Sequence, residues 1–169
     1  TKKIFDDYVH RKLKSCNPSF KVIGLRFFNV YGPGESLKYE MSSPVYKFFN
    51  QIKEKGYCSL FSSYGGYESG KHLRDFVHVD DCCKVIEYLR CNDTKKLIFN
   101  VGTGKPTTFY EIAEIIIDHL KLDKSAIKFI PFPINLKGKY QSYTCADLSN
   151  LKFEGFNYEF ISISEGVKS

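Results

Sequence analysis

The chain has 169 residues, of which 43% are hydrophobic and 16% aromatic, enough for one core of moderate size. It contains no apolar run near the roughly 20 residues that span a bilayer and no apolar signal region at its start, which argues against a membrane protein and predicts a cytoplasmic location. The net charge of +6 comes from 25 Lys and Arg scattered among 19 acidic residues, without the Arg-rich stripe typical of nucleic-acid binding. Two explanations of the positive charge remain: a solvated surface, or a site for an anionic small ligand.

The first half of the chain is predicted to alternate helices with strands. Apolar residues at helical spacing mark the helices, and short apolar runs bounded by Gly, Pro or Ser mark the strands. In order, the pattern predicts a helix over 2–13, a buried strand over 21–30, a loop over 31–40, a helix over 43–55 closed by Gly56, and a strand over 60–61.

The second half continues the alternation after a Gly- and Ser-rich stretch, 62–70, that is typical of a mobile surface loop. It predicts an extended segment over 75–79, a helix capped by Asp80 or Asp81, a strand over 97–101, a helix over 109–117 and an edge strand over 127–130. Thr108 and Glu111 are placed to form a capping box. Strands alternating with helices predict an α/β fold.

The six cysteines have none of the spacings of a metal or disulfide site. There is no C-x-x-C pair and no His at zinc-finger spacing, and the adjacent pair Cys82 and Cys83 would make a poor disulfide framework. We therefore predict reduced, mostly buried thiols and no metal ion.

A glycine-rich phosphate loop is missing from the sequence. Neither G-x-x-G-x-x-G nor G-x-G-x-x-G occurs, and Gly102-Thr103-Gly104, which comes late in the topology, is a weak signal by itself. If the chain belongs to a dinucleotide-binding fold, we expect its nucleotide-binding half to lie outside these residues.

The run Arg26-Phe27-Phe28-Asn29-Val30-Tyr31-Gly32-Pro33 leads a buried strand into a polar turn, the place where open α/β sheets bind ligands. It resembles the R-F-x-N-V-Y-G-P segment of extended short-chain dehydrogenase/reductase enzymes that act on nucleotide sugars. Residues 2–9, 25–35 with Lys38 and Met41, 74–81 with 100–104, and 130–151 also resemble this family. The last segment, which includes P-F-P-I-N-L-K-G-K-Y-Q, is most similar to the enzymes that invert C6 of an ADP-heptose used in the lipopolysaccharide inner core.

The resemblance implies the C-terminal part of a Rossmann-like fold with a small α/β substrate-binding domain, the first nucleotide-binding half being absent. Residues 1–34 and 75–101 would be Rossmann-half elements, and 35–74 and 102–169 the substrate-binding domain. The isolated chain is then expected to be inactive. The full-length enzyme is expected to form a homo-oligomer, with no nucleic-acid or membrane partner.

Two lysines match the catalytic positions of the family. Lys2 matches the lysine of a Tyr-x-x-x-Lys pair whose tyrosine would lie two positions before Thr1; on its own it would be a solvated lysine. Lys38 matches the family's second acid/base residue. Such a residue is needed because hydride leaves one face of the carbon and returns to the opposite face of the ketone, so a base is required on each side of that carbon. The alternative for Lys38 is a solvated loop lysine. With Val30, both are expected to contact NADP, or NAD as the alternative.

The resemblance also implies a set of substrate contacts. Arg74 would hold the diphosphate with its guanidinium fork, unless it forms an ion pair with Asp75 or Asp81. Glu40 departs from the family, which more often has a small hydroxyl residue at this position. The carboxylate of Glu40 would repel a phosphosugar unless the side chain turns away or pairs with a lysine. The full set is Asn29, Glu40, Lys47, Phe61, Ser62, Ser63, Tyr64, Arg74 and Tyr140.

Three functions remain open at this point. The first is NADP-dependent epimerisation of an ADP-heptose at C6 through a transient 6-keto sugar. The second is another nucleotide-sugar epimerase or dehydratase, such as a UDP-hexose 4-epimerase. The third is a non-catalytic module that binds a sugar nucleotide or assists assembly.

Overall fold

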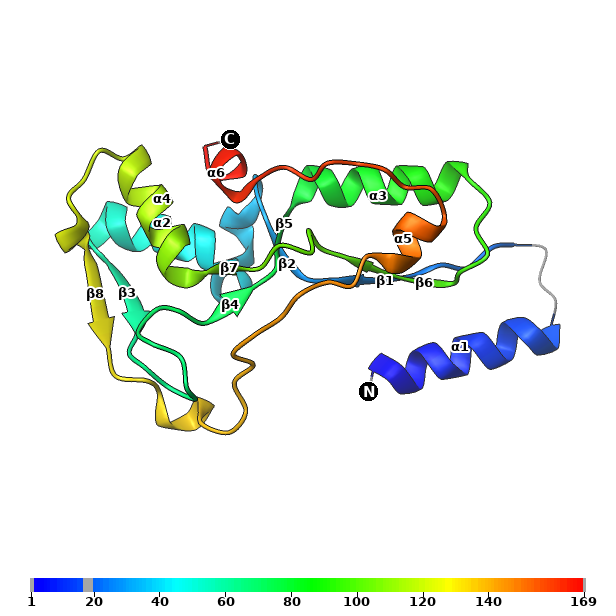
Figure 1. Cartoon of the computed structure of the whole chain (residues 1–169), viewed down its shortest axis with the longest axis horizontal. Helices are drawn as coiled ribbons and strands as arrows, with labels where there is room; N and C mark the ends of the chain where they lie inside the picture. The colour runs from blue at the N-terminus through cyan, green and yellow to red at the C-terminus, as the bar shows by residue number, and fades with distance from the viewer. Residues whose placement is uncertain (1, 17–19, 169) are drawn as a thin grey trace.

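A computed structural model describes residues 2–16 and 20–168, with side chains for 3–13 and 20–168. Figure 1 shows an elongated molecule in which short strands alternate with helices. In chain order the elements are α1 (Lys2–Cys16), β1 (Gly24–Phe27), β2 (Asn29–Tyr31), the 3-10 helix η1 (Glu35–Met41), α2 (Pro44–Lys55), β3 (Cys58–Phe61), β4 (Leu73–Arg74), β5 (Phe76–His78), α3 (Val79–Cys91), β6 (Ile98–Val101), β7 (Thr107–Thr108), α4 (Phe109–His119), η2 (Lys124–Ala126), β8 (Ile127–Ile130), η3 (Ile134–Leu136), α5 (Ser149–Phe153) and α6 (Ile163–Gly166).

The strands pair two by two rather than in one continuous sheet. Parallel pairs join β1 to β6, β2 to β5 and β3 to β8, and an antiparallel pair joins β4 to β7. Parallel strands connected through helices confirm the predicted α/β class. Over the described residues, no sheet of five or six strands forms.

The strand predicted over 21–30 is divided in two. The amide of Phe28 donates to the carbonyl of Val101, at 2.9 Å, whereas the amide of Asn29 donates to the carbonyl of Asp75, at 3.0 Å. The chain therefore changes partner between these two residues, from β6 to β5. This switch brings the residue that begins β2, Asn29, beside the segment that carries Arg74.

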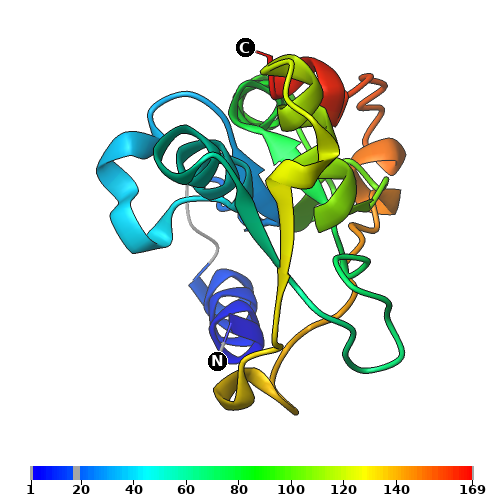
Figure 2. The ribbon, with the colours of Figure 1, turned by 90° about the vertical axis from the view of Figure 1, so that its left-hand side faces the viewer.

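Helices cover the strand pairs from both sides. In Figures 1 and 2, α1 lies on the opposite side of the β1–β6 pair from α3, and α2 and α4 lie together against β3 and β8. Two apolar clusters result. One includes Phe48, Ile52, Leu60, Ile112 and Ile116, and the other includes Val77, Val85, Phe99, Val101 and Leu151.

Local sequence signals set both ends of α2 and the start of α4 close to the predicted positions, whereas α4 ends at His119, two residues beyond the predicted end. Ser43 caps α2, its hydroxyl accepting a hydrogen bond from the amide of Tyr46 at 3.2 Å, and Gly56 ends the helix with a φ of 74°. Thr108 and Glu111 form the predicted capping box of α4.

The predicted cap of α3 is wrong. The helix begins at Val79, so the cap is His78, whose Nδ1 accepts a hydrogen bond from the amide of Asp80 at 3.3 Å. Asp80 and Asp81 already lie in the first turn, where their charge still favours the positive end of the helix.

Helix α1 is attached to the body by an ion pair between Asp6 and Arg26 of β1. Much of its apolar surface stays open: the exposed fractions of Ile4 and Phe5 are 69% and 67%. Within the described part of the chain, no helix is long and apolar enough to cross a bilayer.

The prediction of mostly buried cysteines is wrong. Cys58 and Cys82 are buried, but Cys83 and Cys91 lie on exposed positions of α3 and Cys145 is half-buried. The side chain of Cys16 lies outside the described residues.

Candidate functional site

A pocket of about 420 Å³ lies between α2, β3 and the segment that carries Arg74. Stretches of the chain that are far apart in the sequence contribute to its wall. Five of the nine residues predicted to contact a substrate line it: Asn29, Lys47, Phe61, Arg74 and Tyr140. The fold thus brings these five residues together around one volume, which is large enough for part of a small ligand.

Arg74 is a buried cation, with 8% of its surface exposed. Its Nη1 donates to the carbonyl of Leu73 at 3.0 Å, and the guanidinium lies 4.9 Å from the ring centroid of Tyr140. Burial lowers its pKa from the ordinary value, but a guanidinium stays charged at neutral pH.

The ion pair considered for Arg74 is wrong. The carboxylates of Asp75 and Asp81 are both engaged by other groups, and over the described residues no acidic side chain pairs with Arg74. Of the five N–H donors of its guanidinium, most are left for a ligand, and the missing counter-charge favours an anionic one.

Aromatic rings form one wall of the pocket. The ring of Phe61 meets that of Tyr140 edge-on, with centroids 6.2 Å apart. Phe132, which does not line the pocket itself, packs against both rings with centroid distances of 5.3 Å. Burial raises the pKa of Tyr140, so its hydroxyl is a neutral donor and acceptor at physiological pH. The segment 130–151, on which the sequence resemblance depended most, therefore supplies part of this wall.

Tyr64 supports the wall from behind. Its ring stacks on Phe132 with centroids 4.0 Å apart, and its hydroxyl accepts a hydrogen bond from the amide of Gly138 at 2.7 Å. The neighbouring residues Ser62 and Ser63 donate their amides to the carbonyl of Ile130 and the hydroxyl of Ser69. None of these three predicted contacts lines the pocket.

Lys47 connects the pocket to the loop that precedes α2. Its ammonium donates to the main-chain carbonyl of Glu40 at 2.7 Å. The carboxylate of Glu40 is not the partner of this lysine, and Glu40 is exposed and outside the pocket lining.

The residues predicted to contact the cofactor are spread over three elements. Lys38 is exposed in η1, Val30 is half-buried in the middle of β2 against the second apolar cluster, and Lys2 begins α1. The side chain of Lys2 lies outside the described residues, so the structure places only its backbone.

Two amide groups of the turn Gly102-Thr103-Gly104 are already bound within the protein. The carboxylate of Asp75, which is fully buried, accepts the amides of Thr103 at 2.7 Å and Gly104 at 2.9 Å, and the amide of Ala146 at 2.8 Å. A side chain at Gly102 would come within 2.6 Å of the Cβ atom of Ala146. This turn serves to join chain segments and is unavailable to a phosphate.

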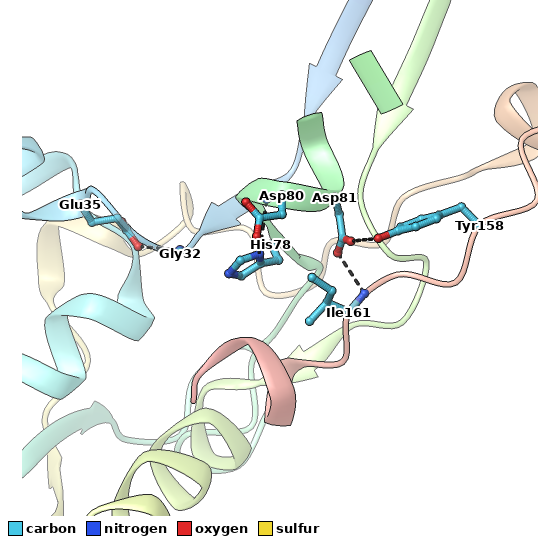
Figure 3. Close-up of polar contacts among 7 residues, drawn as sticks. All are labelled: Gly32, Glu35, His78, Asp80, Asp81, Tyr158 and Ile161. Carbon is cyan, nitrogen blue, oxygen red and sulfur yellow. Dashed lines mark hydrogen bonds and ion pairs between the residues drawn. The ribbon is translucent and has the colours of Figure 1, made fainter. Parts of the chain in front are cut away.

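A second buried carboxylate fastens the C-terminal segment. As Figure 3 shows, Asp81 accepts the hydroxyl of Tyr158 at 2.8 Å and the amide of Ile161 at 3.0 Å. Burial raises the pKa of Asp81, although these hydrogen bonds oppose the shift. Desolvation, and after it the hydrogen bond to Asp81, raises the pKa of Tyr158 to about 12.

A larger cavity, of about 970 Å³, lies under this C-terminal segment. Its charged residues have mixed signs, Lys105 and Lys152 against Glu159 and Glu165, and none of the predicted site residues lines it. We choose the smaller pocket as the candidate site because, of the two, it contains a buried cation, Arg74, with which no acidic side chain of the described residues pairs.

Sequence reasoning missed several residues of the pocket. Gln51 lines it while its Oε1 accepts the amide of Ser59 at 2.9 Å, and Phe109 lies 5.9 Å from the Arg74 guanidinium. His72 is buried, and its Nε2 donates to the carbonyl of Tyr64 at 3.2 Å; burial lowers its pKa, so the ring is neutral. No local pattern marks these residues, because packing between distant segments creates their position.

Comparisons with known proteins identify the relatives of this chain. The model of the NAD dependent epimerase/dehydratase family matches residues 1–102. An ADP-L-glycero-D-manno-heptose-6-epimerase from Alkalilimnicola ehrlichii is 43% identical over 169 residues, all of this chain and 52% of that protein. The chain therefore spans about half the length of this curated relative.

Solved structures show the same similarity in three dimensions. The ADP-L-glycero-D-manno-heptose-6-epimerase of Helicobacter pylori superposes with a TM-score of 0.72 at 25% identity, covering 94% of this chain and 46% of that one. A UDP-glucose 4-epimerase of Thermus thermophilus in complex with NAD has a TM-score of 0.76 at 20% identity, covering 98% and 49%. This second likeness concerns the fold alone.

Proposed function

Because the chain belongs to the NAD-dependent epimerase/dehydratase family, we propose that it forms the substrate-binding part of a nucleotide-sugar epimerase. The observation that carries this proposal is the buried guanidinium of Arg74, which has no counter-charge in the described part of the chain. A diphosphate would supply that charge through two oxygens at once.

The proposed substrate is ADP-D-glycero-D-manno-heptose, converted to its L-glycero epimer at C6 for the lipopolysaccharide inner core. The 43% identical relative, an ADP-L-glycero-D-manno-heptose-6-epimerase, supports the choice, as does the place of Tyr140 in the pocket wall, with Phe132 packed against its ring. Asn29, at the start of β2 and close to the end of β1, is assigned to the sugar end of the pocket, and Arg74 to the diphosphate.

Epimerisation at C6 through a transient 6-keto sugar requires a proton to leave the C6 hydroxyl and later return. We assign Lys38 as the acid/base on one face of the carbon, with a tyrosine expected outside these 169 residues on the other. The exposed side chain of Lys38 is compatible with an approaching substrate.

NADP, or NAD as the alternative, would supply the hydride acceptor and donor when bound. Val30, beside Asn29, fits the nicotinamide end, and we assign Lys2 and Lys38 to the same end. The Gly102 turn does not fit the pyrophosphate, since Asp75 occupies the amides of Thr103 and Gly104. We assign the pyrophosphate to residues beyond this chain.

The two apolar clusters support the proposed division into Rossmann-half elements, 1–34 and 75–101, and a substrate-binding domain, 35–74 and 102–169. Most of the first cluster belongs to the latter ranges, and most of the second to the former. The exposed apolar side chains of α1, Ile4, Phe5 and Tyr8, are in keeping with a homo-oligomer.

The test is conversion of purified substrates by the natural full-length polypeptide. We expect NMR to show ADP-D-glycero-D-manno-heptose becoming the L-glycero epimer with NADP, and no change of UDP-glucose. Conversion of UDP-glucose alone would favour a 4-epimerase. If the protein binds ADP-heptose but converts it neither with NADP nor with NAD, the result would favour a non-catalytic binding module.

A further inference from the structure

One buried carboxylate closes the loop that carries Lys38. Glu35 is 3% exposed. Its Oε2 accepts the amide of Ser43 at 2.5 Å, and its Oε1 accepts the Ser43 hydroxyl at 2.7 Å and the amide of Gly32 at 3.3 Å. Figure 3 shows the contact with Gly32, just beyond the end of β2. The two ends of the loop, residues 32 and 43, are therefore bound to the same side chain.

The contacts of Glu35 link three elements that the proposed site uses: the end of β2, the 3-10 helix η1 that carries Lys38, and the start of α2. The Ser43 hydroxyl that donates to Glu35 also accepts the amide of Tyr46 and so caps α2. The same helix carries Lys47 into the pocket wall. Burial of a carboxylate is costly unless donors surround it, and here three donors and the positive end of a helix do so.

The loop between the two ends is held in a strained shape. Tyr39 has a φ of 45° and a ψ of −122°, a backbone region that residues other than glycine rarely adopt, although the residue is 80% exposed. The amide and hydroxyl of Ser42 both donate to the Tyr39 carbonyl, at 3.1 and 2.7 Å, and Lys47 binds the carbonyl of Glu40. Strain of this kind persists only where surrounding contacts determine the backbone.

We propose that Glu35 is a positioning residue for Lys38: by closing the loop it sets where the Lys38 ammonium stands relative to the substrate pocket. This inference rests on the acid/base role proposed for Lys38. Tyr39, the strained residue, directly follows Lys38 in the chain. If the loop relaxed, the backbone at Tyr39 would change conformation and Lys38 would move with it.

The test compares Glu35→Gln with a matched control, Glu111→Gln, in the natural full-length polypeptide. Glu111 makes the same contacts with Thr108 as Glu35 makes with Ser43, a main-chain amide and a hydroxyl, but at the exposed start of α4. Glutamine keeps the size of the side chain and replaces one acceptor oxygen by an amide group that faces donors.

We expect Glu35→Gln to lower kcat about 10- to 100-fold, the order expected for a small misplacement of a reacting group, with KM for the nucleotide sugar within about threefold. Hydrogen exchange at the amides of Gly32 and Ser43 should become faster by a similar factor. Glu111→Gln should change neither, and Glu35→Asp should recover part of kcat.

The double variant Glu35→Gln/Lys38→Ala separates positioning from a general structural effect. If Glu35 acts through Lys38, the double variant should be no slower than Lys38→Ala alone. A further loss of the same factor in the double variant would overturn the inference while leaving the role of Lys38 intact. Full turnover by Lys38→Ala would instead overturn the role of Lys38, and the positioning role with it.

Discussion

The guanidinium of Arg74 faces the ring of Tyr140 at 4.9 Å, inside a pocket where no acidic side chain of the described residues pairs with it. This contact joins β4, which carries Arg74, to the segment 130–151, which carries Tyr140 and is the part of the sequence most similar to the ADP-heptose enzymes. An aromatic face partly compensates for burial of the charge and leaves the N–H donors directed elsewhere.

Replacing Arg74 should weaken substrate binding more than chemistry. We expect Arg74→Ala to raise the Kd for ADP-heptose about 10- to 100-fold, the effect of losing a charge-assisted contact. Arg74→Lys should recover only part, because an ammonium lacks the fork that binds two oxygens. Isothermal titration calorimetry measures both, with the exposed Arg90→Ala as the control. An unchanged Kd for Arg74→Ala would remove the diphosphate from this position.

Replacing Lys38 should have the opposite effect. We expect Lys38→Ala to lower kcat by about 10²- to 10⁴-fold while affinity stays within a few fold, as for loss of a proton-transfer group. Lys55→Ala, at the exposed end of α2, is the control for loss of a positive charge. Steady-state kinetics at saturating substrate decide the matter, and near-normal turnover would return Lys38 to a solvated loop position.

Glycine at position 39 should stabilise the protein. The backbone of Tyr39 costs about 1–3 kcal/mol in its present conformation, whereas glycine adopts it freely and loses only about 0.5–1 kcal/mol through chain entropy. Tyr39→Gly should therefore raise the free energy of unfolding by about 1 kcal/mol, measured by urea denaturation. Lys121, with a φ of 56°, lies in the ordinary left-handed region and should gain less from the same change. A lower midpoint for Tyr39→Gly would mean that the Tyr39 ring contributes packing.

Asp81 should make stability depend on pH in an unusual direction for an acid. Because burial raises its pKa in the folded state, the carboxyl favours folding most when protonated, and this contribution is lost as pH rises through the raised pKa. Relative to Asp81→Asn, the wild-type protein should gain stability as pH falls from 7 toward 4.5. Urea midpoints of both proteins at the two pH values test this; a wild-type loss relative to the variant would mean that the Tyr158 and Ile161 hydrogen bonds dominate.

The cysteines should divide into two reactivity classes. Burial raises the pKa of Cys58 to about 11 and that of Cys82 to about 12, so neither forms thiolate at pH 8. Cys83 and Cys91 are exposed on α3 and should be alkylated by iodoacetamide within minutes to hours in the folded protein. Mass spectrometry of peptides locates the label. Modification of Cys82 at the rate of its neighbour Cys83 would show that α3 opens in solution.

Local signals predicted those parts of the fold that local chemistry determines. Helix α2 begins after Ser43 and ends at Gly56, and α4 begins after Thr108. Each of these residues marks a helix end because it satisfies backbone groups within its own turn. The break after Phe28 could not be predicted in this way, since it depends on two strands, β5 and β6, that come much later in the chain.

The candidate site was predictable to a similar extent. Asn29 and Arg74 follow from a family motif, and the fold brings both to one pocket. Glu35 was missed, although a carboxylate in a Gly-Pro loop just before a helix could have indicated a closing contact with the helix cap. His72 and Gln51 had no signal, because their surroundings arise only when β3, α2 and the loop before β4 pack together.

The adjacent residues Arg74 and Asp75 perform opposite tasks with opposite charges. One side chain enters the pocket as a cation, and the other turns inward to gather the amides of Thr103, Gly104 and Ala146. Successive side chains in an extended backbone point to opposite sides. Deletion of a single residue just before this pair would shift the register by one position, so that the acid Asp75 would face the pocket where the anion is proposed to bind and the apolar Phe76 would face the N–H donors. The spacing of the chain here therefore matters as much as the identity of its residues.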